Sequence, residues 1–151
     1  MTQSSDTSPR PCPECGAPPV AGLNCGEQLG AVLAWEWQDP ELSAQHFLTV
    51  ASYNLQHPAQ FTAAAYAGLR AAFIDHLDNG LPVAEIRRRI SHVAEGSQRV
   101  LQPEAERRFV LRPWPQTIAD VYLPDQPEGA AGRVRAWAAS IRAEFATESN
   151  P

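Results

Sequence analysis

The sequence contains no lysine: all twelve basic residues are arginine, against seventeen acidic residues, and the net charge is −5. An acidic balance of this kind disfavours a protein that coats nucleic acid. The sequence also lacks an apolar run long enough to cross a membrane. Its first eleven residues, MTQSSDTSPRP, have no apolar stretch of the kind found in a secretory signal. We therefore expect a cytoplasmic protein that does not associate with membranes.

Cysteine is scarce, with only Cys12, Cys15 and Cys25 in 151 residues. In a small cytosolic protein, a close pair plus a third cysteine indicates metal binding before it indicates a disulfide. In the motif CPECG, two thiolates separated by two residues can turn toward one ion, and Gly16 permits the tight turn that follows. The alternative, a redox pair, would require a thioredoxin-like βαβ pattern that this sequence does not show.

The rest of the sequence has the apolar period of α-helices. It predicts a single domain over 12–147, a disordered tail at 1–11 and a short C-terminal tail at 148–151. Helices are expected at 27–38, 41–56, 60–77, 83–95 and 134–147. Residues 109–111, FVL, suggest a short strand, and Thr117 with Asp120 suggests the capping box of a further short helix. The predicted fold is all-α: a compact bundle of about five helices with an N-terminal zinc-knuckle loop.

A tetrahedral metal site requires a fourth ligand, for which the sequence offers four histidines. His46 and His57 share a face of the predicted second helix, but they are about 16 Å apart along its axis, too far to hold one ion. The short link at 39–40 makes the first two helices antiparallel neighbours, which places Cys25 opposite residues near 54. His57 is therefore preferred, and Pro58 frees it from helical geometry. We predict a structural Zn²⁺ held by Cys12, Cys15, Cys25 and His57.

Two alternatives stay open for these histidines. His46 is the rival fourth ligand, and His57 could instead offset the dipole at a helix end. If His46 is not a ligand, it shares a helix face with Tyr53 and lies near Glu36 and Asp39 of the first helix. Such a group could act as a general acid or base. A buried histidine that is hydrogen-bonded to a neighbour is the simpler interpretation.

Arginine is concentrated between positions 87 and 112. Together with a zinc knuckle, this concentration raises nucleic-acid binding as a possible function, although the acidic protein as a whole argues against it. The four tryptophans are expected to anchor the core or an interface. An exposed Trp35 or Trp114 would mark a partner surface.

Four segments, CPECGA, DPELSAQHFLTVASYNLQHP, TIADV and VRAWA, together resemble an uncharacterised bacterial family, a domain of unknown function. The resemblance extends from about Cys12 to Phe145, and the QHP element that contains His57 is its most distinctive part. It implies that Cys12, Cys15, His46 and His57 belong to a common design. It implies no activity.

The leading interpretation is a non-enzymatic, zinc-stabilised helical protein with a regulatory or interaction role, its partner being another protein or a second copy. One alternative is a metal-dependent enzyme similar to the DinB-like helical bundles. That superfamily brings three histidines together on one metal, and the spacing of His46 and His57 does not fit this pattern. The other alternative is a nucleic-acid-binding regulator.

Overall fold

A computed structural model describes residues 10–95 and 99–148 of the chain. Within these ranges the chain forms α-helices, short 3-10 turns and no β-strand, which confirms the predicted all-α class. There are seven α-helices in this part rather than five, because the predicted second helix is split in two and the further short helix expected after Thr117 is present. They are α1 (Cys25–Trp35), α2 (Pro40–Ala44), α3 (His46–Leu55), α4 (Ala63–Asn79), α5 (Val83–Glu95), α6 (Ile118–Val121) and α7 (Ala130–Glu148), with the 3-10 turns η1 (Pro58–Gln60) and η2 (Glu104–Glu106).

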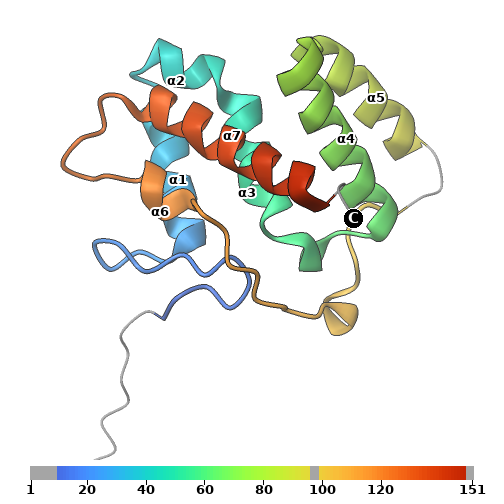
Figure 1. The fold of residues 1–151 in the computed structure, drawn as a ribbon, viewed down its shortest axis with the longest axis horizontal. Coiled ribbons are helices and arrows are strands. Elements are labelled where there is room, and N and C mark those ends of the chain that lie inside the picture. Colours follow the sequence, from blue (N-terminus) through green and yellow to red (C-terminus); the bar gives the residue numbers. More distant parts are fainter. Residues whose placement is uncertain (1–9, 96–98, 149–151) are drawn as a thin grey trace, which may run out of the picture.

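The core is organised around α7, which crosses the middle of the molecule (Figure 1). Its buried side chains recur at helical spacing, and α2, α3 and α6 pack against it. Trp137, Ile141 and Phe145 are fully buried. The predicted last helix is thus confirmed, and it begins four residues earlier than its first apolar position, Val134, suggested.

The predicted helix over 41–56 is wrong in one respect, because it is broken at Gln45. Asp39 caps the start of α2, since its side chain accepts a hydrogen bond from the Leu42 N–H. Gln45 then leaves helical geometry (φ −96°, ψ 12°), and its N–H bonds to the Leu42 carbonyl only three residues back. The break allows both short helices to face α7, with Leu42 and Leu55 buried.

The other expected helices match the structure with shifted ends. The predicted helix over 60–77 begins only at Ala63, because residues 58–60 form a 3-10 turn, and it stops at Gly80, which has a left-handed φ of 69°. Thr117 and Asp120 form the predicted capping box at the start of α6. The strand expected at 109–111 is absent, and this part of the chain is irregular. A β-strand needs a neighbouring strand to pair with, and the described part of the chain places none beside residues 109–111.

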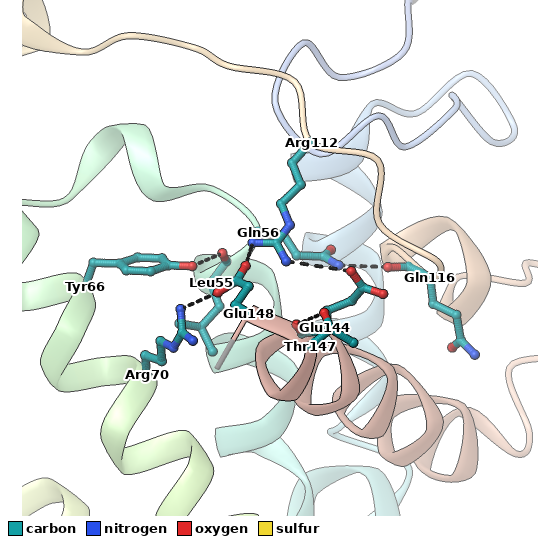
Figure 2. Close-up of polar contacts among 9 residues, drawn as sticks. All are labelled: Leu55, Gln56, Tyr66, Arg70, Arg112, Gln116, Glu144, Thr147 and Glu148. Atoms are coloured by element: carbon teal, nitrogen blue, oxygen red, sulfur yellow. Dashed lines mark hydrogen bonds and ion pairs between the residues drawn. The ribbon is translucent and has the colours of Figure 1, made fainter. Parts of the chain in front are cut away.

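Side-chain contacts tie the irregular segment before α6 to the helical body. Figure 2 shows Arg112 between Glu144 and Glu148 of α7, with Arg70 of α4 reaching Glu148 from the other side. The Gln56 amide donates to the Gln116 carbonyl at 2.7 Å. The segment therefore follows a defined path past the end of α7 without forming secondary structure.

Residues 10–24 form loops that pack beside the start of α1 (Figure 1). The predicted disordered tail at 1–11 lies mostly outside the described residues, as does nearly all of the predicted tail at 148–151. No helix in the described ranges has the length and apolar character needed to span a membrane.

Candidate metal centre

The knuckle motif folds as a tight turn around the sulfur of Cys12. The backbone N–H groups of Glu14 and Cys15 each lie 3.4 Å from Cys12 Sγ, and the Ala17 N–H lies 3.4 Å from Cys15 Sγ. The turn closes with the Gly16 N–H donating to the Cys12 carbonyl, and Gly16 has a positive φ of 77° that favours glycine. The sequence therefore encodes locally a loop whose amides already point at two sulfurs.

Cys25 is held at the first position of α1, which begins two residues before the start expected at position 27. Asn24 precedes it and forms a capping box with Glu27, in which each side chain accepts a hydrogen bond from the other residue's backbone. This cap fixes the end of the helix, and the N-terminus of a helix stabilises a thiolate. The Cys25 sulfur is thus attached to the rigid body of the protein.

His57 lies just beyond α3, outside helical geometry, as expected for a residue before Pro58 (φ −128°, ψ 61°). Its Nδ1–H donates to the Tyr53 carbonyl at 2.6 Å. This bond leaves Nε2 to face the sulfurs, at 3.5 Å from Cys25 Sγ and 3.6 Å from Cys12 Sγ. A backbone acceptor on one nitrogen is how proteins commonly orient a histidine that ligates a metal through the other.

The four predicted ligands therefore converge. One ligand atom from each of Cys12, Cys15, Cys25 and His57 lies within 4.8 Å of all the others. Cys15 and His57 are buried, with exposed fractions of 2% and 8%, while Cys12 and Cys25 are partly buried. This set of donors is compatible with a metal site.

The metal-free cluster concentrates negative charge on Cys25. A hydrogen bond from the Cys15 thiol is the main cause that lowers the pKa of Cys25 to about 3, against the effect of burial; His57 and Tyr53 lower it further. The same hydrogen bond, together with burial, raises the pKa of Cys15. A thiolate is the form of cysteine that binds metals, so one ligand is ready at neutral pH.

His57 carries the matching positive charge. Burial on its own would lower the pKa of His57, but contacts with Cys25, with the Tyr53 carbonyl and with Cys12 together raise it to about 9. These shifts favour a thiolate on Cys25 and a protonated His57 when no metal is bound. A metal ion that binds His57 here displaces that proton.

Two further residues of the centre were not expected from the sequence. The Tyr53 ring stacks on the His57 ring at 4.0 Å between centroids, and its hydroxyl lies 3.6 Å from Cys25 Sγ. Glu14 is 5% exposed, and its carboxylate accepts a hydrogen bond from the Ala59 N–H at 2.7 Å. The position of Glu14 inside the CPECG motif was the one signal that pointed to it.

Residues 10–146 match the sequence model of a family of unknown function, DUF5946. The chain belongs to this family. No curated protein and no solved structure matches the chain. The expected membership of a family of unknown function is thereby confirmed, and the match includes all four residues of the cluster.

His46 is not part of the cluster in this DUF5946 chain. As the first residue of α3 it points outward, with 53% of its side chain exposed, and its Nδ1 lies 2.8 Å from the Glu36 carboxylate. The polar site considered as an alternative for His46 and Tyr53 does not form, because Tyr53 faces Cys25 instead. The expected contact with Glu36 is confirmed, and the expected burial of His46 is not.

His76 lies elsewhere, with its Nδ1–H donating to the Leu81 carbonyl at 2.7 Å and its ring against Phe47. The arginines between 87 and 112 are dispersed as well. Arg88 pairs with Glu85 on α5, Arg89 with Asp75, and Arg112 with the end of α7. Three described arginines of this stretch, Arg88, Arg89 and Arg112, thus form ion pairs in different parts of the molecule.

Proposed function

We propose that this protein is a zinc-stabilised helical protein with a regulatory or protein-interaction role, in which a structural Zn²⁺ is held by Cys12, Cys15, Cys25 and His57. The ion would fasten the N-terminal knuckle across the start of α1 and the end of α3. We call this arrangement the clasp. It joins residues 45 positions apart in the sequence, Cys12 and His57.

One observation carries the proposal: the spacing of His57 Nε2 from two sulfurs. Zn–S bonds of about 2.3 Å and a Zn–N bond of about 2.0–2.1 Å at tetrahedral angles place sulfur and nitrogen about 3.5–3.6 Å apart. The separations from Cys25 Sγ and Cys12 Sγ are 3.5 and 3.6 Å. His57 thus already has the separations from Cys25 and Cys12 that a shared zinc ion would require.

A structural role is favoured over a catalytic one by the number of ligands. Three thiolates and one imidazole complete the tetrahedron, whereas catalytic zinc keeps one position open for water or substrate. A metal-dependent enzyme of the DinB-like type is therefore the weaker alternative.

The chemistry of the site also favours a reducing compartment, because its three cysteine ligands must remain thiols when no metal is bound. A bacterial cytoplasm remains our proposal for the location. The interaction role is proposed because the clasp orders a surface without offering a reaction centre.

Elemental analysis of the purified protein tests the clasp, with about one zinc per chain as the expected result. Cys12→Ser and His57→Ala should each lower both the zinc content and the melting temperature. His46→Ala is the matched control, because His46 is exposed and contacts only Glu36 among the described residues. A metal-free protein whose melting temperature does not respond to added zinc would overturn the proposal.

A further inference from the structure

Three consecutive apolar residues lie unprotected on the surface. Phe109, Val110 and Leu111 have exposed fractions of 64%, 72% and 59%. Val100 and Leu101 are also exposed, at 41% and 53%. Soluble proteins keep contiguous exposed apolar runs short, and such a run commonly marks a binding surface.

The backbone of this run is also open. Among the described residues, no hydrogen-bond partner is found for the N–H and C=O groups of 109–111, although the next residue, Arg112, donates its N–H to the Glu14 carbonyl at 3.1 Å. Figure 1 shows this stretch as an open trace between η2 and α6, along the edge of the molecule. An unpaired, open backbone can accept a further strand.

Val110 and its neighbour Leu111 have different surroundings. Arg108 and Val110 line a cavity, while Leu111 lies beside Gly16, with its Cδ1 3.4 Å from the place of an added Cβ. A strand that paired with this run would therefore direct every second side chain toward the cavity.

The cavity has a volume of about 300 Å³. Its lining includes the acidic residues Glu14 and Glu106 and the basic residue Arg108, and Pro58 and Ala59 add less polar residues. This volume is at the lower end for ligand pockets and suits one long side chain rather than a larger molecule.

The carboxylates of the cavity are better placed to receive a ligand than its guanidinium. Glu14 is nine-tenths buried; one of its oxygens accepts from the Ala59 N–H, and the other has no hydrogen-bond partner among the described residues. Arg108 directs Nη1 to the carbonyls of Ala105 and Arg107 in its own loop. The cavity therefore favours a cation with an apolar stem.

We infer that residues 107–112 and this cavity form a docking site for an extended peptide of another protein. The peptide backbone would pair with 109–111, and an arginine or lysine side chain would enter the cavity to meet Glu14 and Glu106. The residues on either side of that basic one would face Phe109 and Leu111, and are therefore apolar. This inference rests on the interaction role proposed above and specifies the chemical class of the partner, an extended basic peptide.

The charges around the run argue against two other occupants. If a second copy paired its 109–111 with this one in antiparallel register, Arg108 would lie opposite Arg112, and like charges directly across a strand pair are destabilising. An acidic peptide would bring its carboxylate against those of Glu14 and Glu106. A basic side chain meets two acidic residues of the cavity lining, Glu14 and Glu106, against one arginine, Arg108.

The probe is a fluorescently labelled peptide, Val-Thr-Val-Arg-Val-Thr-Val with blocked ends, titrated against the zinc-loaded protein by anisotropy. We expect saturable binding, weakened about tenfold or more when glutamate replaces the arginine. Glu106→Gln should weaken binding about tenfold. Glu104→Gln is the matched control, since Glu104 is exposed on the same turn outside the cavity, and should change binding less than about twofold. Phe109→Ser should also weaken it.

The inference is overturned if the peptide does not bind at about 1 mM, a weak limit for specific association. Equal affinity for the glutamate peptide, or unchanged affinity in Glu106→Gln, would overturn it as well. Tighter binding of a single-stranded RNA oligomer, lost in Phe109→Ser, would reassign the surface to nucleic acid. Zinc is measured in the same sample. If the zinc-loaded protein does not bind the peptide, only the docking-site proposal is overturned. If the protein is stable without metal and still binds the peptide, only the clasp proposal is overturned.

Discussion

Glu14 accepts a hydrogen bond of 2.7 Å from the backbone N–H of Ala59. Glu14 lies between the two cysteines of the knuckle, and Ala59 lies two residues after His57. This one bond therefore joins the two segments that carry the first and last ligands of the clasp. This hydrogen bond holds the two segments next to each other and does not depend on a metal.

Glu14→Ala is expected to lower the free energy of unfolding by about 2 kcal/mol, because it leaves the buried Ala59 N–H without an acceptor. It should also lower zinc affinity, since His57 loses a support for its position. Glu14→Gln is the control, because the amide oxygen can still accept this bond, and its loss of stability should be much smaller. Chemical denaturation and a competitive zinc titration measure both effects. Equal losses in the two variants would contradict this role.

Tyr53 is expected to shield the clasp through its ring more than through its hydroxyl. The hydroxyl lies 3.6 Å from Cys25 Sγ, a long contact, while the ring stacks closely on His57. Tyr53→Phe should therefore lower the free energy of unfolding by about 1 kcal/mol, and Tyr53→Ala should lower it by about 3 kcal/mol. The rate at which a chelator removes zinc should rise markedly only in Tyr53→Ala. A faster loss of zinc from Tyr53→Phe than from Tyr53→Ala would refute this account.

The thiolate–imidazolium pair predicts how the stability of metal-free protein depends on pH. The pKa of Cys25 is lowered from 9 to about 3, so its contribution is complete above pH 9 and is lost as the pH falls toward 3. The pKa of His57 is raised from 6.5 to about 9, so its contribution is complete below pH 6.5 and is lost as the pH rises through 9. The two slopes oppose each other between 6.5 and 9. The pair should therefore give level stability there and lose it in acid.

Denaturation with a chelator present, in wild type and in Cys25→Ser, separates the contribution of this pair from that of the carboxylates elsewhere in the protein. The difference in unfolding free energy between the two proteins should be constant from pH 6.5 to 9 and should shrink below that range. A difference that stays the same or grows in acid would show that the pair does not form.

Gln56 is expected to hold the end of α3 against α7. It is 1% exposed; its amide donates to the Gln116 carbonyl at 2.7 Å, and its oxygen accepts from Trp137 Nε1 at 3.2 Å. Gln56→Leu leaves the Gln116 carbonyl and the Trp137 Nε1–H without these hydrogen bonds, and it should lower the free energy of unfolding by about 3 kcal/mol. Gln38→Leu, at an exposed position after α1, should change it by less than about 0.5 kcal/mol. Similar losses at the two positions would argue against the buried network.

The fold could be predicted where local chemistry decides it. The apolar spacing of Val134, Trp137 and Ile141 specified the last helix, and the Thr117–Asp120 box specified the start of α6. The break at Gln45 was missed, because it satisfies the packing of α2 and α3 on α7 rather than any signal in the residues themselves. As a consequence, His46 is the first residue of α3 and contacts Glu36, whereas the sequence had suggested that it lies near Tyr53 on one helix face.

The sequence by itself determined the knuckle, the position of Cys25 at a helix start and the release of His57 from the helix by Pro58, because each depends on residues that are close in the chain. Only the tertiary structure decided that these parts meet. The contact between Cys12 and His57 joins residues 45 positions apart, and its geometry depends on how α1 packs on α6 and how α3 and α6 pack on α7. The same packing placed the apolar run at 109–111 on the surface beside Glu14, where its residues alone had suggested a strand.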